Sequence, residues 1–225
     1  MASPKNMEIR TCLKKATQKG YDSKAKAYLH NLVNVQLNTE VAFGLPMVTH
    51  CHHVGLLTER FVECNPEFKH GLCGEHPYVV GYMHDIGKVN PLHQSGALIL
   101  RLKPQFPWGM VKNEHTVKGS FILEDMPVAK EVALRHHAYS VNGYPEDVKK
   151  MPLKNRALDR ICQVVQILDN TEASSIRYME ACNVTPCAID RGFFAMVDDD
   201  TFDTVLNFMY SEGNKMIHRW GGYKS

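Results

Sequence analysis

The sequence lacks the features of a membrane or secreted protein. None of its apolar runs approaches the roughly 18 residues that a membrane-spanning helix requires. Residues 1–20, MASPKNMEIRTCLKKATQKG, also lack the apolar core of a signal peptide. We therefore expect a cytoplasmic protein with no membrane partner.

Paired cysteines and excess charge are missing as well. The seven cysteines are an odd number, and no two of them form a CxxC pair. The sequence therefore predicts neither a disulfide framework nor a zinc site held by thiolates. A net charge of only +2 neither indicates nor excludes a partner that is a nucleic acid.

Strict alternation of apolar and polar residues is scarce, and helical periodicity dominates instead. We expect helices at residues 23–38, 47–64, 77–85, 113–126, 127–139, 153–178, 190–197 and 201–220, with a loop of turn-forming residues at 140–152. No linker rich in Gly, Ser or Pro divides the chain. The predicted fold is all-α, a single-domain helical bundle in which N-terminal helices of residues 1–45 pack on a core at 46–225.

Histidine is the residue in excess, with twelve copies. Several fall on helix faces that should be buried; His50, for example, shares a face with Val54, Leu57 and Phe61. Burying so many imidazoles and carboxylates is costly unless cations satisfy them. A pair of divalent ions would do so, and imidazole with carboxylate suits Fe, Mn, Ni, Co or Zn. In the adjacent pair His84–Asp85, the histidine can bind one ion while the carboxylate bridges to the second.

The order of the candidate residues resembles that of HD-domain phosphohydrolases. The H…HD…H…HH…D pattern is formed by His50, His84–Asp85, His115, His136–His137 and Asp169. HDIGK at 84–88 matches the family signature, and HHAYSVNGYP at 136–145 is similar to the HHExxDGxGYP signature of the HD-GYP branch. The resemblance covers residues 48–209. It implies an HD catalytic domain at 46–225 that hydrolyses a cyclic dinucleotide, of the cyclic di-GMP or cyclic GMP-AMP type.

The resemblance also implies roles for individual residues. The implied metal ligands are His50, His84, Asp85, His115, His136, His137 and Asp169. A hydroxide bridging two divalent transition ions would attack phosphorus. Asp85 and Lys88 are the expected catalytic residues, with Lys88 one turn past His84 and gripping a phosphate oxygen. Lys88, Tyr144 and Glu172 are expected to contact the substrate, and Glu172 with His137 is the place for an additional ion.

Some positions depart from the family pattern. Ala138 stands where the HD-GYP signature has glutamate, the segment before Gly143–Pro145 is one residue shorter, and Glu172 replaces an aspartate. These differences favour two ions over three. His52 and His53 are expected off the inner face, partly exposed or facing the substrate.

Other functions fit the same residues. A nucleotidase, a triphosphohydrolase or a single-strand nuclease would use the same dinuclear site, although the balanced charge argues against a nucleic-acid partner. Dioxygen chemistry at a di-iron site is a rarer outcome, against which Lys88 argues. A non-catalytic module that binds a nucleotide belongs to another class, and the intact ligand pattern argues against it.

Overall fold

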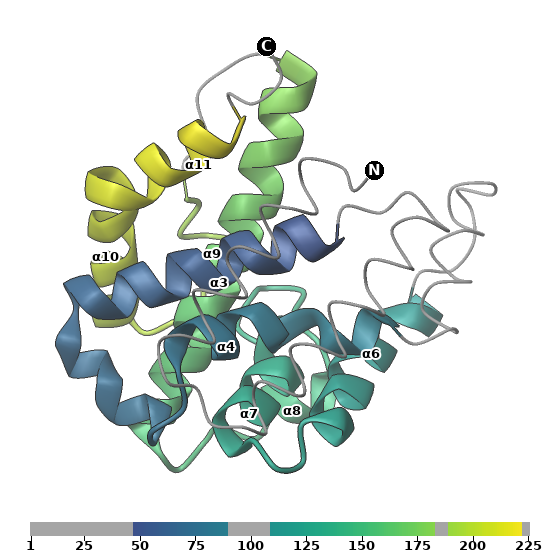
Figure 1. The fold of residues 1–225 in the computed structure, drawn as a ribbon. Helices are drawn as coiled ribbons and strands as arrows, with labels where there is room; N and C mark the ends of the chain where they lie inside the picture. The colour runs from purple at the N-terminus through teal and green to yellow at the C-terminus, as the bar shows by residue number, and fades with distance from the viewer. Residues whose placement is uncertain (1–46, 90–108, 183–188, 222–225) are drawn as a thin grey trace, which may run out of the picture.

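The computed structural model describes residues 47–89, 109–182 and 189–221, and every regular element within these ranges is a helix (Figure 1). The predicted all-α fold is confirmed, while the helix expected at 23–38 lies outside the described residues. The elements are α3 (Met47–Cys64), η1 (Pro66–Leu72), α4 (Pro77–Tyr82), η2 (Met83–Val89), α6 (Gly109–Ile122), α7 (Pro127–Arg135), α8 (Glu146–Lys149), α9 (Arg156–Cys182), α10 (Asp199–Phe208), η3 (Met209–Gly213) and α11 (Asn214–Gly221).

Helices α3 and α9 form the centre of the bundle. In Figure 1, α10 and α11 lie on one side of α3, and α4, α6, α7 and α8 lie on the other. The apolar stripe predicted for α3, at Val54, Leu57 and Phe61, is fully buried. In α9 the periodicity predicts a stripe of Ala157, Ile161, Val164, Val165 and Leu168, and all of these except the partly exposed Ala157 are fully buried. Burying these stripes removes apolar surface from water, which is the main force that holds the helices together. Their polar neighbours, His50 and Asp169, are drawn to the same interface.

The segment that carries His84 and Asp85 changes helix type. The predicted helix at 77–85 ends as an α-helix at Tyr82, and the chain continues as the 3₁₀ helix η2. In a 3₁₀ helix the side chains at i and i+3 lie above one another. Lys88 is therefore placed over Asp85, to which it is hydrogen-bonded, rather than one α-helical turn from His84.

Helix η2 makes an unusually close approach to α6. A Cβ atom on Gly87 would lie 1.8 Å from the carbonyl oxygen of His115, so only glycine permits this contact. The approach brings His115 beside Asp85, with Nε2 3.5 Å from Oδ1. His115 lies inside α6, which begins at Gly109, four residues before the start of the helix predicted at 113–126.

The helix predicted at 190–197 is wrong, because this segment consists of turns. The carboxylate of Asp190 accepts a hydrogen bond from Gly192 N at 2.8 Å, which starts a turn. The guanidinium of Arg191 donates to the carbonyl oxygens of Phe194 and Val197, at 2.6 and 2.9 Å. These side-chain bonds to the backbone hold the segment in its turns. The helix predicted at 201–220 is interrupted by the π-helical turn η3 between α10 and α11.

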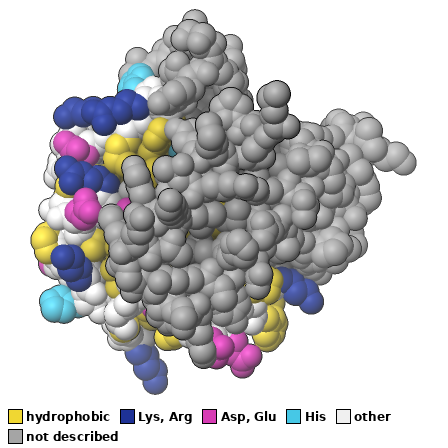
Figure 2. Space-filling view, viewed as in Figure 1, with side chains coloured by type: hydrophobic (Ala, Val, Ile, Leu, Met, Phe, Trp, Pro, Cys, Tyr) yellow, Lys and Arg dark blue, Asp and Glu magenta, His cyan; other side chains and the backbone are white. Residues whose placement is uncertain are grey.

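The helices in the described ranges include none that is both long enough and apolar enough to cross a bilayer. On the described surface visible in Figure 2, Lys and Arg side chains are interspersed with Asp and Glu. This part of the surface carries no continuous basic stripe.

Candidate metal centre

Two groups of histidines and aspartates meet in the interior of the bundle. The first, here called the His50 cluster, contains His50 of α3, His84 of η2 and Asp169 of α9. The second, the His115 cluster, is formed by Asp85, His115, His136 and His137. Within each cluster one nitrogen or oxygen atom of every residue lies within 4.8 Å of the others. The structure thus brings together all seven residues that the sequence singled out as metal ligands; their role as ligands remains a prediction.

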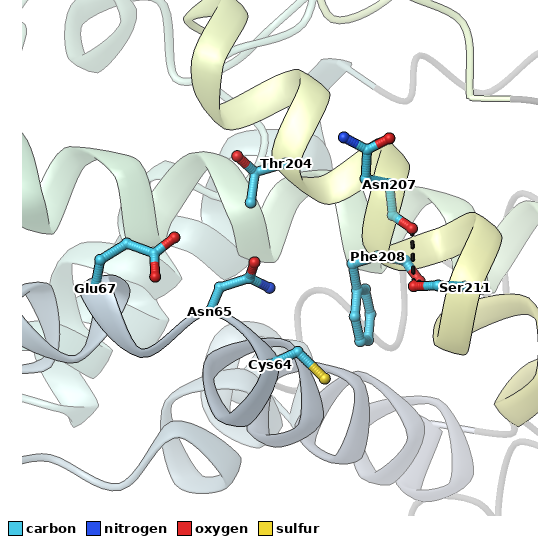
Figure 3. Close-up of a pocket in the computed structure, with 7 residues that line it drawn as sticks. All are labelled: Cys64, Asn65, Glu67, Thr204, Asn207, Phe208 and Ser211. Atoms are coloured by element: carbon cyan, nitrogen blue, oxygen red, sulfur yellow. Dashed lines mark hydrogen bonds between the residues drawn. The ribbon is translucent and has the colours of Figure 1, made fainter.

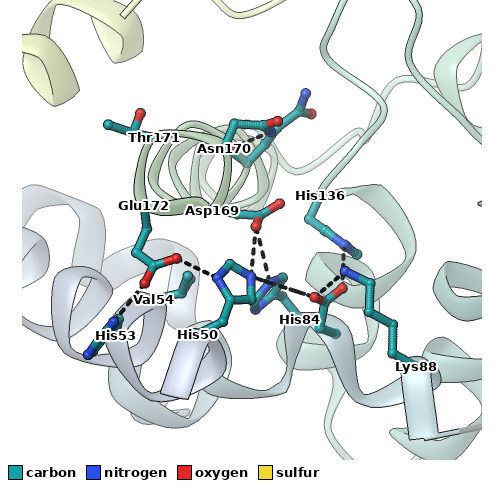
Figure 4. Close-up of polar contacts among 12 residues, drawn as sticks. His50, His53, Val54, His84, Lys88, His136, Asp169, Asn170, Thr171 and Glu172 are labelled. Atoms are coloured by element: carbon teal, nitrogen blue, oxygen red, sulfur yellow. Dashed lines mark hydrogen bonds and ion pairs between the residues drawn. The ribbon is translucent and has the colours of Figure 1, made fainter. Parts of the chain in front are cut away.

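Asp85 lies between the two clusters. Its Oδ2 is 3.6 Å from His50 Nε2 and 3.5 Å from His84 Nε2. Its Oδ1 is 3.5 Å from His115 Nε2 and 3.3 Å from His136 Nε2. Figure 4 shows His50, His84 and Asp169 turned toward one another, with His136 and Lys88 beside them. Asp85 therefore has the geometry of a carboxylate that can bridge two ions, each oxygen facing a different cluster.

Hydrogen bonds at Nδ1 fix which nitrogen of each ring faces the clusters. His84 Nδ1 donates to the carbonyl oxygen of Gly81 at 2.7 Å, and His136 Nδ1 donates to that of Ala133 at 2.9 Å. His50 Nδ1 bonds Glu172 Oε2 at 2.6 Å. In a neutral ring the nitrogen opposite such a donor carries a lone pair. All three rings thus present Nε2 to the clusters as a potential ligand atom.

The two clusters differ in their protonation. Burial lowers the pKa of His50, but hydrogen bonds to Asp169 and Glu172 outweigh it and raise the pKa to about 10. Burial also lowers the pKa of His84, but the nearby carboxylates of Asp85 and Asp169 outweigh it and raise the pKa to about 9. The His50 cluster therefore holds protons at neutral pH when no metal ion is bound.

In the His115 cluster, burial dominates and lowers the pKa of all three histidines, which are His115, His136 and His137. Burial raises the pKa of Asp85, but Lys88 and His84 outweigh it and hold the pKa well below its ordinary value. The result is a carboxylate facing neutral imidazoles, which are the protonation states that ligate transition ions.

Two polar atoms test whether these residues fit a cation. Asp85 Oδ1 and His136 Nε2 are buried and lie 3.3 Å apart, yet neither has a hydrogen-bond partner within the described residues. Both atoms are acceptors, because His136 donates through its other nitrogen. Two buried acceptors facing each other are costly unless a cation lies between them. The residues of the His115 cluster therefore fit a divalent ion, and those of the His50 cluster fit a second through the shared Asp85.

Lys88 and Tyr144 border the clusters. The Lys88 ammonium pairs with Asp85 Oδ2, and its side chain is 24% exposed, so it lies between the cluster and the surface. The ring of Tyr144 packs on His137, with centroids 4.6 Å apart and planes 30° apart. A Cβ atom on Gly143 would lie 2.5 Å from Ala138 O, so glycine allows the chain to fold back and set Tyr144 beside the histidines.

Glu172, His52 and His53 have environments that the sequence did not indicate. His52 and His53 are each 8% exposed, so the expectation that they are partly exposed is wrong. His52 bonds the hydroxyl of Tyr78, and His53 bonds Glu172. Glu172 is buried, and its two oxygens bond His50 and His53, while its contact with a substrate stays a prediction. The equal spacing of His50 and His53 on α3 and of Asp169 and Glu172 on α9 was the available signal.

A separate cavity of about 540 Å³ lies where the end of α3 and η1 meet α10 and η3 (Figure 3). It is lined by Cys64, Asn65, Glu67, Thr204, Asn207, Phe208 and Ser211. With one carboxylate and no histidine in its lining, it does not resemble either metal cluster.

Comparison with known families accords with this geometry. The model of the HD domain matches residues 47–174, which is more than half of the chain and includes both clusters. No curated protein and no solved structure matches the chain.

Proposed function

This chain belongs to the HD-domain family, whose members are typically metal-dependent phosphohydrolases, and from this premise we propose that it is a phosphodiesterase that hydrolyses a cyclic dinucleotide. The observation that carries the proposal is the position of Asp85 between the two clusters, with Lys88 beside it. Two divalent transition ions sharing Asp85 are the proposed cofactors. The nucleotide class rests on the resemblance of residues 136–145 to the HD-GYP signature.

The proposed ligands of one ion are His50, His84, Asp85 and Asp169, and those of the other are Asp85, His115, His136 and His137. When bound, divalent ions supply Lewis acidity, which activates water and draws charge from phosphoryl oxygens.

The chain's own residues would orient the substrate. The Lys88 ammonium remains charged, because burial lowers its pKa less than Asp85 and Asp169 raise it. Its pairing with Asp85 holds it at the edge of the clusters, where it can donate to a non-bridging phosphate oxygen. The Tyr144 ring, held against His137, offers a surface on which a nucleobase can stack. Together these two residues would hold a phosphodiester and its base on one side of the metal centre.

A substrate panel tests the proposal. Cyclic dinucleotides, nucleoside triphosphates and single-stranded DNA would be incubated with the chain and Mn²⁺, Fe²⁺ or Ni²⁺, with Asp85→Ala as the control. We expect a linear dinucleotide or mononucleotides from the cyclic substrate, and loss of both metal content and turnover in Asp85→Ala. Preferential hydrolysis of triphosphates or of DNA would contradict the substrate class. Tight nucleotide binding without turnover in the metal-loaded chain would instead identify a binding module.

A further inference from the structure

Glu172 connects the His50 cluster to a second histidine outside it. Glu172 is 2% exposed, and its carboxylate lies 2.6 Å from His50 Nδ1 through Oε2 and 2.6 Å from His53 Nδ1 through Oε1 (Figure 4). The carboxylate can only accept in these bonds, so each ring donates its Nδ1–H. His50 is thereby held with Nε2 toward Asp169, from which it is 3.0 Å away.

His53 is held in turn by the C-terminal helix. Its ring stacks on Trp220 of α11, with centroids 4.0 Å apart and planes 4° apart. Helix α11 is anchored in the core by Ile217, which is fully buried. A continuous set of contacts therefore runs from α11 through His53 and Glu172 to His50, joining residues beyond the 47–174 match to the metal centre.

We propose that Glu172 is a positioning residue for the metal ligand His50, and that Trp220 supports it by clamping His53. The inference rests on the proposed function in that His50 is taken as a ligand. A carboxylate bonded to the far nitrogen of a ligating histidine fixes the orientation of the ring and makes the ligand atom more basic. The second oxygen of Glu172 needs His53, because a buried carboxylate oxygen without a partner is costly.

Mn²⁺ binding to the full chain, measured without nucleotide, tests the role of Glu172. Titrations followed by calorimetry and by the magnetic resonance signal of free Mn²⁺ would resolve the two binding steps. We expect Glu172→Ala to weaken one step by about 10- to 100-fold and leave the other within about twofold of wild type, because His50 belongs to one cluster. Glu172→Gln, which keeps one acceptor but no charge, should give an intermediate loss.

Thr171→Ala is the matched control on α9, since the Thr171 hydroxyl bonds the Ile167 carbonyl at 2.7 Å and Thr171 belongs to neither cluster, so the substitution should not affect either step. The inference is overturned if both Glu172 variants bind Mn²⁺ as wild type does, or if Thr171→Ala shows the same loss. Should Glu172→Ala fail to fold, Glu172→Gln decides by the same criterion.

Variants of α11 test the support from Trp220. Trp220→Ala should weaken the same Mn²⁺ step as Glu172→Ala, by a smaller factor, and Trp220→Phe should restore it because a ring can still stack on His53. Ile217→Ala should lower the melting temperature without changing Mn²⁺ affinity. Equal losses in Ile217→Ala and Trp220→Ala would show that general loosening of α11 is responsible and would overturn the role of Trp220.

The same titration separates this inference from the proposed function. A wild-type chain that binds Mn²⁺ with the expected sensitivity to Glu172 but hydrolyses no nucleotide would refute the phosphodiesterase alone. A wild-type chain that binds no Mn²⁺ would overturn both.

Discussion

Replacing Asp85 by asparagine should remove the stabilisation that divalent ions give the folded chain. The carboxylate is fully buried and faces imidazole nitrogens of both clusters at 3.3 to 3.6 Å. Asparagine keeps the shape of the side chain but removes the charge that both proposed metal sites share. One substitution should therefore weaken two sites.

The size of the effect follows from linkage between binding and folding. At a Mn²⁺ concentration one hundred times Kd, each site stabilises the folded state by about 2.7 kcal/mol, or about 5 kcal/mol for two sites. In a domain of this size that corresponds to a rise in melting temperature of roughly 10–20 °C. Loss of a residue that hydrogen-bonds a metal ligand weakens metal affinity by up to roughly 100-fold, and loss of the ligand Asp85 itself should weaken it by at least as much. Each site in Asp85→Asn would then contribute only about 0.4 kcal/mol, and the rise would shrink to roughly 2–3 °C.

The assay compares melting temperatures with and without Mn²⁺ for each variant, so that any change in the metal-free protein cancels. Asp169→Asn affects only the His50 cluster and should retain about half of the stabilisation. Asp159→Asn is the control, because Asp159 lies on α9 like Asp169 but belongs to neither cluster. Its carboxylate accepts hydrogen bonds from Tyr139 and Gln163 instead. A full Mn²⁺-dependent rise in Asp85→Asn, or equal losses in the Asp85 and Asp169 variants, would refute the shared-ligand reasoning.

Three further predictions concern packing, pH and Lys88. Gly87→Ala should lower the free energy of unfolding, measured by chemical denaturation, by about 3 kcal/mol, because the added Cβ would clash with the His115 carbonyl. In the control Gly74→Ala the added Cβ faces open space, so the loss should be only about 1–2 kcal/mol, from the positive φ at this position. With metal chelated, the melting temperature should fall as pH rises from about 6.5 to about 10, because His50 and His84 have raised pKa values in the folded state and lose their stabilising protons over this range. Bound Mn²⁺ should abolish this fall. A melting temperature that does not change with pH in the metal-free chain would contradict the prediction. Lys88→Ala should lower turnover by about 10²- to 10³-fold in steady-state assays while Mn²⁺ content stays unchanged, and a parallel loss of metal would argue against a contact with phosphate.

Much of the fold could be predicted because apolar periodicity reports burial directly. The helix predicted at 47–64 has the bounds of α3, and the predicted stripe of α9 is fully buried except at Ala157. The prediction failed at 190–197, where apolar residues suggested a helix but the Asp190 and Arg191 side chains bind the backbone instead. It also gave no sign that the chain tightens at Met83 into η2. Periodicity reports burial, and it reports neither turns held by side-chain bonds to the backbone nor a local change of helix type.

The sequence by itself determined which side chains are available: imidazoles and carboxylates on faces that the hydrophobic effect must bury, in an order shared with the HD domain. Only the tertiary structure decided their partners, because distances between segments far apart in the chain depend on helix packing. The close contact at Gly87 places His115 beside Asp85, and the crossing of α3 and α9 brings Glu172 within hydrogen-bond distance of His50 and His53. The sequence pattern indicates which side chains must be buried, whereas helix packing determines which of the buried groups contact each other.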